Sequence, residues 1–169
     1  PFTEEEREKL ITSSWNYAEK EKYRVWYLRP FLALNTGARV GELHALQIRD
    51  FDFNAKLLSI ERTAWRPSGT TTPKVKPGTK NGKIRTISIT DNVVNEVKSH
   101  IKWMEMYWKW YVKKPLTDEQ YILFDPRDLG PIHFGASESR FMTLLRQTGL
   151  NKYGRSFKSL RHTHATWLL

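Results

Sequence analysis

A repeating apolar pattern between Val93 and Tyr111 constrains the fold of this chain more than any other part of its sequence. Apolar side chains recur there at steps of three or four residues, at Val93, Val97, Ile101, Met104, Trp108 and Tyr111. This is the spacing of one face of an α-helix. Asp91 can cap such a helix at its start, and Pro115 ends it. We therefore expect a long helix whose apolar face packs against a core.

The same helix carries a second apolar stripe beside the first, formed by Trp103, Tyr107 and Trp110. Together the two stripes offer more apolar surface than one core face needs. One interpretation is a wide face that is buried in the core. The other is a docking surface for another segment or protomer. The sequence alone leaves both interpretations open.

Local start and stop signals predict further helices on both sides of this one. Thr3 and Glu6 form a capping box at the beginning of the chain. We expect helices after Thr3, over about Lys20–Leu34 with a kink or restart at Pro30, after Arg39, over Ser137–Gln147 with Gly149 closing it, and from about Ser156.

Strand patterns lie in the middle of the chain. Residues alternate at the period of a strand in two places, at Leu58, Ile60 and Arg62 and again at Arg85, Ile87 and Ile89. The intervening stretch Trp65–Lys83 is rich in Pro, Gly, Thr and Lys, which predicts a loop and a hairpin tip with Asn81-Gly82 as the turn. The chain is thus predicted to form one α+β domain over residues 1–169, mainly helical with a small antiparallel sheet.

Charge narrows the choice of partner. The formal net charge of +10 and the isoelectric point near 9.8 favour a polyanionic partner, with nucleic acid ahead of an acidic membrane surface. The sequence has no apolar stretch of transmembrane length and no signal-peptide pattern, which removes the membrane and predicts a cytosolic protein. With no cysteine, and five histidines in no metal-ligand pattern, we expect neither a bound metal nor a cofactor.

Two basic segments predict a phosphate site. Lys158 and Arg161 stand three residues apart, so a helix would place both cations on one face, where they repel unless an anion lies between them. Arg39 follows the break at Thr36-Gly37 and precedes a new apolar helix pattern, so it is expected in a helix first turn. The helix dipole disfavours a cation there and favours an anion. A bound phosphate resolves both conflicts.

These segments resemble the catalytic domain of the tyrosine recombinases, the family of phage and transposon integrases. The family's first box, Thr-Gly-x-Arg-x-x-Glu-Leu, matches Thr36-Gly37, Arg39 and Glu42-Leu43, and its second box, His-x-x-Arg-His-Thr, matches Arg161-His162-Thr163. Lys158 departs from the second box, because the family has a histidine there. Similar stretches also include Phe2–Glu6, Asp50–Asp52 and Thr79–Ile89, so the resemblance spans nearly the whole chain.

The resemblance implies a DNA-cleaving site that works without metal, in which arginines and lysines stabilise the developing charge. Arg39 and Arg161 would bind the non-bridging oxygens of the scissile phosphate, since a guanidinium donates bidentately. The alternative for each is a surface salt bridge. Lys80 would protonate the leaving oxygen from the minor groove. Lys158 keeps the phosphate contact, and we interpret it as an electrostatic residue rather than a base.

Four more cations are candidate contacts to the DNA backbone, namely Lys74, Lys76, Lys83 and Arg155. The alternative for Lys80 is that it belongs to the same solvated basic loop and only binds phosphates. His162 and His164 are interpreted as packing or helix-tethering residues. Glu42 is expected to orient a neighbour, because a carboxylate beside two phosphate-binding arginines stays ionised.

The nucleophile of the resembled family is a tyrosine on a later helix, which forms a 3′-phosphotyrosyl bond. No tyrosine follows Tyr153 in this sequence, and Tyr153 precedes the second box, so we expect no nucleophile in this chain. The end of the sequence within the apolar helix pattern Ala165–Leu169 favours a fragment. Such a fragment would lack the part with the nucleophile and an N-terminal DNA-clamping domain, and would be cleavage-defective by itself.

The resulting hypothesis is site-specific DNA recombination, which integrates or excises a mobile element. The expected partners are double-stranded DNA and, in the full-length protein, the other protomers of a synaptic tetramer. The expected location is the bacterial cytoplasm, in association with the nucleoid. The alternatives are a type IB topoisomerase and a non-catalytic DNA-binding or regulatory module.

Overall fold

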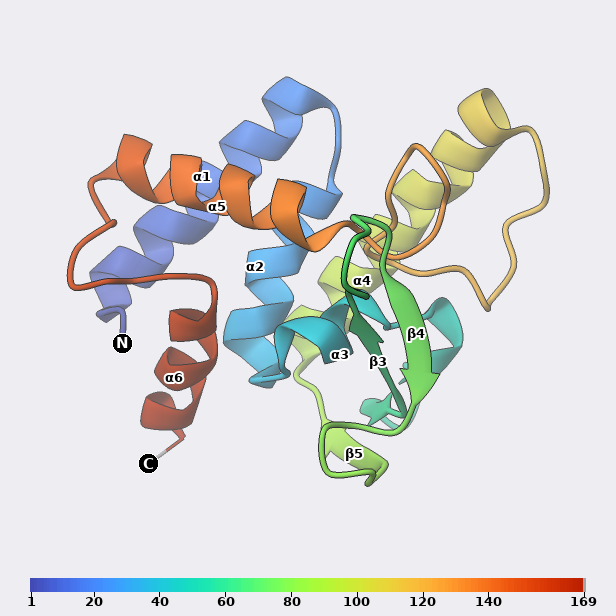
Figure 1. Ribbon diagram of the computed structural model, residues 1–169, viewed down its shortest axis with the longest axis horizontal. Helices are drawn as coiled ribbons and strands as arrows, with labels where there is room; N and C mark the ends of the chain where they lie inside the picture. Colours follow the sequence, from blue (N-terminus) through green and yellow to red (C-terminus); the bar gives the residue numbers. More distant parts are fainter. Residues whose placement is uncertain (169) are drawn as a thin grey trace.

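The computed structural model describes residues 1–168 and contains helices that lie to one side of two small antiparallel sheets (Figure 1). The helices are α1 (Glu4–Glu21), α2 (Val25–Thr36), α3 (Val40–His44), the 3₁₀-helix η1 (Ile48–Asp50), α4 (Asp91–Tyr107), the π-helix η2 (Trp108–Val112), α5 (Phe134–Thr148) and α6 (Lys158–Trp167). The strands are β1 (Phe51–Asp52), β2 (Leu57–Ile60), β3 (Arg62–Trp65), β4 (Lys74–Pro77) and β5 (Arg85–Ser88). This confirms the α+β class, mainly helical.

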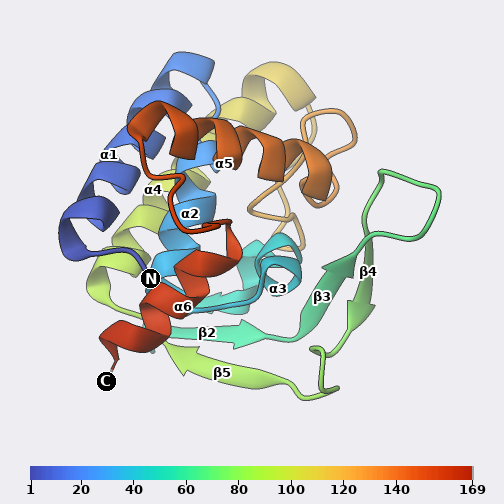
Figure 2. The same ribbon diagram turned by 60° about the vertical axis from the view of Figure 1, so that its left-hand side comes forward.

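Helix α2 forms the centre of the domain, and α1, α3, α4 and α6 all pack against it. Almost every side chain of α2 is buried, including the apolar run from Phe31 to Leu34. A helix that is apolar on all sides requires neighbours on all sides. Helix α2 packs against α6 and ends at Thr36. The segment that follows, which carries Arg39, therefore lies beside α6 (Figure 2).

The first two helices differ in part from the expected boundaries. The capping box at Thr3 and Glu6 is confirmed, with the Thr3 side chain accepting from the Glu6 backbone and the Glu6 carboxylate accepting from the Thr3 backbone. The break lies at Lys22, which adopts a left-handed conformation with φ 52°, and α2 then runs unbroken through Pro30. The predicted start near Lys20 and the predicted restart at Pro30 were therefore wrong, while a helix over most of the predicted range is confirmed. A kink at Pro30 stays a prediction.

The strands form a long bent hairpin, with its tip at residues 66–73. β2 pairs with β5, while β3 pairs with β4, so one arm is β2–β3 and the returning arm is β4–β5 (Figure 2). The turn at Asn81-Gly82 lies in a loop that interrupts the returning arm between β4 and β5. The prediction that this turn is the hairpin tip was wrong, because the strand on each side of it pairs with the other arm.

Helix α4 confirms most of the expected core face. Val93, Val97 and Met104 are fully buried, and Trp108 is nearly so. The helix begins one residue earlier than expected, because the Thr90 side chain, rather than Asp91, accepts from the Val93 backbone as the cap. From Trp108 the chain continues as the π-helix η2, whose wider turn changes the register of the stripe.

This change in register leaves Tyr111 on the surface, with 75% of its area exposed. The expectation that Tyr111 faces the core was therefore wrong. The second stripe is divided in the same way, because Trp103 and Tyr107 pack against the core while Trp110 is 64% exposed. The wide core face thus holds for α4 and for Trp108, and not for Trp110 and Tyr111 of η2.

The last helices lie close to their expected positions. α5 begins at Phe134, three residues before the predicted start, and Gly149 closes it with φ 69°. α6 begins at Lys158. It ends at Trp167 with Leu168 as its C-cap, earlier than the expected apolar pattern, while Leu169 lies outside the described residues. Among the described helices, none is long and apolar enough to cross a membrane.

Candidate functional site

The four residues predicted to act on a phosphate line one cavity of about 630 Å³. Arg39 comes from the segment between α2 and α3, Lys80 from the loop between β4 and β5, and Lys158 and Arg161 from α6. The wall of this cavity also includes Ala33, Ala38, Val40, Glu138, Ser156, Phe157 and His162. Residues far apart in the sequence thus place four cations and one carboxylate around a single opening.

Arg39 owes its position to a sharp turn after α2. Gly37 closes α2 in a left-handed conformation with φ 63°, which turns the chain toward α3. Arg39 then occupies the N-cap of α3, one residue before the first turn in which it was expected. Helix α3 in turn lies directly against β3, because a Cβ atom on Gly41 would stand 2.5 Å from the Ala64 carbonyl oxygen.

A buried carboxylate anchors two arginines beside the cavity. Glu42 is fully buried, and its Oε1 accepts from Nη1 of Arg39 at 3.1 Å and from Nη1 of Arg85 at 2.9 Å. Its Oε2 accepts from the Arg39 backbone N–H and from Nη2 of Arg85, both at 2.8 Å. Glu42, and not a bound phosphate alone, therefore offsets the positive charge at the start of α3.

These contacts decide the ionisation of Glu42. Burial by itself raises the pKa of this carboxyl, but hydrogen bonds from Arg85 and the Arg39 backbone outweigh burial and lower the pKa to about 2. Glu42 is thus a carboxylate at every ordinary pH, in agreement with the expected orienting role. It cannot serve as a general base, because a base needs a pKa closer to the working pH.

Arg161 projects from α6 toward Arg39 and Arg85. Burial lowers the pKa of Arg161 most, and the positive charges of Arg39 and Arg85 lower it further. Its Nη1 is buried and has no hydrogen-bond acceptor among residues 1–168. A buried N–H donor without an acceptor is costly. An anion in the cavity would satisfy this donor and relieve the repulsion among the three arginines.

His164 tethers the helix that carries Arg161. Its Nδ1 lies 2.8 Å from the Leu34 carbonyl oxygen near the end of α2. Its ring also covers Gly37, where a Cβ atom would stand 2.4 Å from Cδ2 of His164. This is the helix-tethering role predicted for His164. His162, in contrast, is exposed at the wall of the cavity.

Lys80 lies at the exposed end of a loop with a fixed base. The Gly82 N–H donates to the Thr79 carbonyl at 2.8 Å, and the Thr79 hydroxyl donates to the Lys83 carbonyl at 2.8 Å. Lys83 lines a second cavity of about 500 Å³, which also borders Arg39 and Arg161. The structure therefore separates the two lysines, since Lys80 faces the cavity of Lys158 and Lys83 faces its neighbour.

The other predicted DNA contacts fall into two groups. Lys74 and Lys76 are exposed on β4, where they pair in register with Trp65 and Thr63 of β3. Arg155 is only 9% exposed. Its Nη1 and Nη2 donate to the Glu6 carboxylate at 2.9 and 2.7 Å, and Nη2 also donates to the first carbonyl of the chain at 3.0 Å. The structure thus gives Arg155 a structural role in place of the predicted DNA contact.

Arg85 is a site residue that sequence reasoning missed. It lies on the inward side of β5 with Ile87 and Ile89, while Thr86 and Ser88 are exposed. A charged residue on the inward side of a strand requires a partner. The alternation of β5 in the sequence already placed Arg85 on the inward side of the strand. That position indicates an acidic group opposite Arg85.

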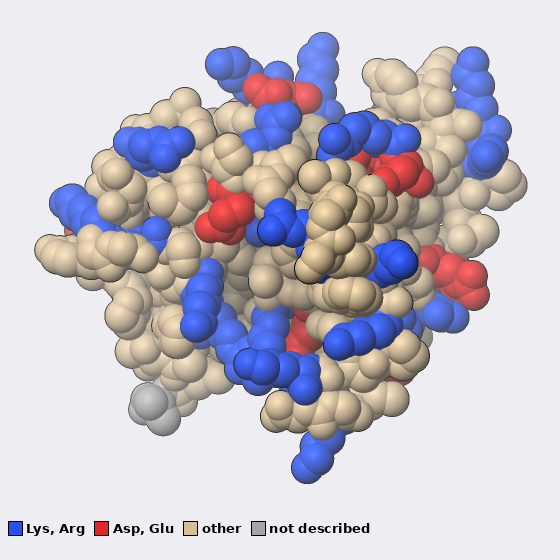
Figure 3. Space-filling model, in the orientation of Figure 1, with Lys and Arg blue, Asp and Glu red and all other residues tan. Residues whose placement is uncertain are grey.

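Lys and Arg side chains gather around this opening on the face that α6 and α3 share (Figure 3). The planar guanidinium groups on several elements favour an anion that offers several oxygens, such as a phosphodiester. The model of the family described as "Phage integrase family" matches residues 2–169. The chain belongs to the phage integrase family.

Individual relatives agree with this assignment. The chain is 28% identical over 134 residues to the integrase of Staphylococcus phage L54a. This match covers 79% of this chain and 37% of that protein. Its fold resembles that of the Tn1549 transposon integrase, which was solved with transposon right end DNA. The TM-score is 0.74 at 20% identity, and the match covers 99% of this chain and 52% of that one. XerA recombinase has a TM-score of 0.65 at 21% identity, covering 99% and 48%. This integrase-family chain thus spans about half or less of the length of these relatives.

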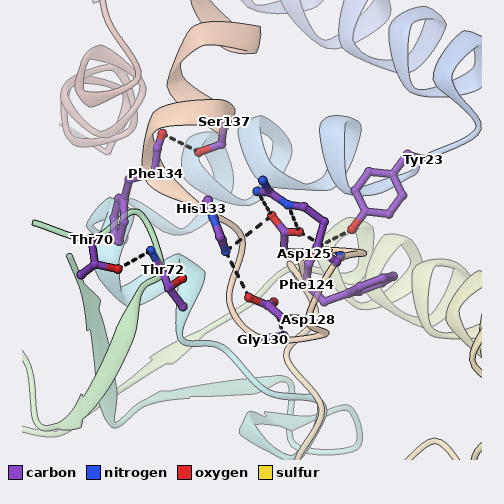
Figure 4. A network of polar contacts seen from close by, with 11 residues as sticks. Tyr23, Thr70, Thr72, Phe124, Asp125, Asp128, Gly130, His133, Phe134 and Ser137 are labelled. Carbon is purple, nitrogen blue, oxygen red and sulfur yellow. Dashed lines mark hydrogen bonds and ion pairs between the residues drawn. The ribbon is translucent and has the colours of Figure 1, made fainter. Parts of the chain in front are cut away.

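Outside the cavity, this integrase-family chain brings together Asp125, Asp128 and His133 (Figure 4). Such a trio has the donor types of a metal site. Both oxygens of Asp125 already accept from Arg127 at 2.8 Å, and Asp128 accepts from the Gly130 N–H and lies 3.2 Å from Nε2 of His133. Because each donor has a partner within the loop, we interpret the group as the network that closes residues 125–133.

Proposed function

We propose that this chain is the phosphate-activating part of a site-specific recombinase that cuts and rejoins double-stranded DNA. One observation carries the proposal most: Arg39, Lys80, Lys158 and Arg161 meet at one cavity, and Nη1 of Arg161 is buried without an acceptor. A cavity with these charges is suited to one phosphodiester of the DNA backbone. The family assignment supports the same conclusion.

In the proposed reaction, Arg39 and Arg161 donate to the two non-bridging oxygens of the scissile phosphate. A tyrosine hydroxyl attacks the phosphorus and loses its proton to water. This attack forms a 3′-phosphotyrosyl bond and breaks the bond from phosphorus to the 5′ oxygen. Lys80 gives its proton to that leaving oxygen. The guanidinium groups stabilise the charge that develops on the phosphoryl oxygens during attack, where a fixed cation contributes most.

Lys158 takes an electrostatic part in this scheme. It is exposed at the opening of the cavity, on the first residue of α6, and lies on the same helix face as Arg161. An ammonium there attracts the phosphate and leaves the transfer of the tyrosine proton to another group. This proposal keeps the role that the departure from the family's histidine suggested.

The nucleophile is proposed to come from outside residues 1–169. Within the described part of the chain, none of the tyrosines lines either of the two cavities that border Arg161. We further propose that the complete protein acts as a tetramer that joins two DNA sites. The DNA-cleaving part of the proposal, and not the tetramer, has support from XerH recombinase, which was solved in a post-cleavage complex with its difH substrate. XerH has a TM-score of 0.67 to this chain at 19% identity, and the match covers 99% of this chain and 41% of XerH.

Arg161→Ala is expected to lower the rate of DNA cleavage about 100- to 1,000-fold in the protein that contains this chain, because one donor to the transition state is lost. The measurement is single-turnover formation of a covalent protein–DNA adduct on a nicked substrate. DNA affinity should fall by no more than the contribution of one phosphate contact. The salt slope, which is the slope of the logarithm of the binding constant against the logarithm of the salt concentration, should become smaller in magnitude by about 0.9. Arg146→Ala on the exposed side of α5 is the matched control and should leave both values unchanged.

Two other results would point to the alternative functions. If Arg161→Ala reduces binding and cleavage in parallel, Arg161 is a plain phosphate contact. If the unaltered protein binds DNA and never forms an adduct, it is a binding module. Relaxation of supercoiled DNA without a recombination site would favour a topoisomerase.

Lys80 can be tested through the leaving group. Lys80→Ala should lose cleavage about 100- to 10,000-fold, as expected for a general acid. A substrate with sulfur in place of the bridging 5′ oxygen should restore cleavage, because a thiolate leaves without a proton. The same substrate should not restore Arg161→Ala. If Lys83→Ala, and not Lys80→Ala, responds to the sulfur substrate, then Lys83 is the acid.

A further inference from the structure

A buried arginine lies directly behind the phosphate cavity. Arg29 of α2 is 2% exposed, and burial lowers the pKa of its guanidinium to about 9, so it still carries its charge at neutral pH. Its Nε donates to Nε2 of His44 at 3.0 Å, and Nη1 donates to the Ser137 carbonyl at 3.4 Å. Its guanidinium lies 3.6 Å from the centre of the Phe157 ring, just before Lys158. A buried cation of this kind requires a counter-ion.

Glu138 of α5 is the acidic group nearest to this cation. Its Oε2 lies 3.8 Å from Nη2 of Arg29, and its Oε1 accepts from the Phe157 N–H at 3.5 Å. Glu138 is also the acidic member of the cavity wall, and 41% of its side chain is exposed. The remaining charged groups of that wall are cations, with Lys158 next to Phe157.

We propose that Arg29 is a positioning residue for the phosphate site and that it acts through Glu138. Arg29 holds the carboxylate of Glu138 against the start of α6, so that Lys158 remains available for phosphate. This inference rests on the proposed function, because it concerns the same cavity. It gives Arg29 a part in DNA binding although its side chain does not reach the surface.

Two cations attract the carboxylate of Glu138. Arg29 is buried, so its attraction for Glu138 acts through a medium of low dielectric constant. Lys158 is exposed, so water and salt weaken its attraction for the same group. Glu138 therefore stays with Arg29. Without the charge of Arg29, the balance reverses, and Glu138 would pair with Lys158 and compete with the phosphate.

The test is a double-mutant cycle with Arg29→Met and Glu138→Gln, measured by binding to a double-stranded oligonucleotide over a range of salt concentrations. Methionine fills much of the space over Phe157 without a charge. Arg29→Met should weaken binding about eightfold at about 0.1 M salt and lower the salt slope by about 0.9, the value of one phosphate contact. Adding Glu138→Gln to Arg29→Met should restore both quantities.

The restored binding separates positioning from a purely structural role. If Arg29 only supported the fold, removal of its partner would not repair DNA binding. Phe141→Leu serves as a structural control, because Phe141 packs against Phe157 at 5.1 Å between ring centres and carries no charge. It should lower the melting temperature and leave the salt slope unchanged.

Glu138→Gln alone keeps the inference testable if Arg29→Met does not fold. A carboxylate that is already held away competes little, so this variant should tighten binding by about twofold or less. A gain of about eightfold would mean that Glu138 already pairs with Lys158 and would overturn the inference. Equal affinities for Arg29→Met and the unaltered chain would overturn it as well. Absence of salt-dependent DNA binding in the unaltered chain would instead refute the proposed function, and this inference with it.

Discussion

Glu42→Gln is expected to lower the free energy of unfolding by about 3 kcal/mol at neutral pH, because it removes a buried carboxylate whose pKa lies near 2. Glutamine keeps the shape of the side chain, but it leaves the guanidinium groups of Arg39 and Arg85 without their counter-ion. The measurement is chemical denaturation of both proteins, monitored by circular dichroism.

The same substitution should separate DNA binding from catalysis. Loss of one negative charge makes the face around Arg39 and Arg161 more positive, so nonspecific DNA affinity should stay equal or rise. Cleavage should fall, because Arg39 no longer has the carboxylate that fixes its position. A parallel fall of affinity and cleavage would contradict the orienting role of Glu42.

The pH dependence gives a third measure of the same group. The folded-state pKa of Glu42 is lowered from 4.5 to about 2, so its contribution to stability is fully present above about pH 4.5 and is lost as the pH falls toward 2. The stability difference between the unaltered chain and Glu42→Gln should therefore shrink over this interval. A difference that stays constant from pH 7 to about pH 2 would show that Glu42 is not the ionised partner of the arginines.

Glu6→Gln is the matched control for this experiment. A hydrogen bond from Arg155 is the largest cause that lowers the pKa of Glu6, which is also about 2. Glu6 lies at the start of α1, in contact with Arg155 and away from the cavity residues. Its replacement should lower stability at neutral pH, and this loss should shrink as the pH falls from about 4.5 to about 2, without any change in DNA affinity or cleavage.

The sequence predicted local elements of this fold better than their long-range pairing. Alternation identified the residues of β2 and β5, and apolar spacing identified α4. The partner of each strand was not predictable, because Asn81-Gly82 has the chemistry of a hairpin turn wherever it lies. The break at Lys22 was missed for a related reason. A lysine with positive φ carries none of the Gly or Pro signal that marks a helix end.

The candidate site shows the same division. Arg39 and Arg161 were identified because each stood in a setting that was unfavourable for a cation without an anion. The burial of Arg155 and Arg29 was not predictable, since each depends on a partner far away in the sequence, Glu6 for the former and Glu138 for the latter. Tertiary contacts, rather than residue type, thus separate a basic residue that lines the cavity from one that supports the fold.

Gly37→Ala is expected to lower the free energy of unfolding by about 3 kcal/mol, of which about 1 kcal/mol is the cost of a left-handed alanine and the rest is crowding. Gly37 has φ 63°, and a Cβ atom would stand 2.4 Å from Cδ2 of the His164 ring. That ring is held by its contact to the Leu34 carbonyl, so it cannot move without shifting α6 and with it Arg161. The measurement is denaturation, combined with cleavage by the protein that contains this chain.

Gly149→Ala distinguishes the two contributions. Gly149 closes α5 as Gly37 closes α2, with φ 69°, and no atom lies within 4 Å of the position of its Cβ. This control should therefore show the conformational cost alone, about 1 kcal/mol, and leave cleavage unchanged. In a His164→Ala background, Gly37→Ala should cost no more than Gly149→Ala, because the crowding partner is gone. An undiminished cost of Gly37→Ala in that background would show that backbone strain, and not the packing of α6 on α2, makes glycine necessary at residue 37.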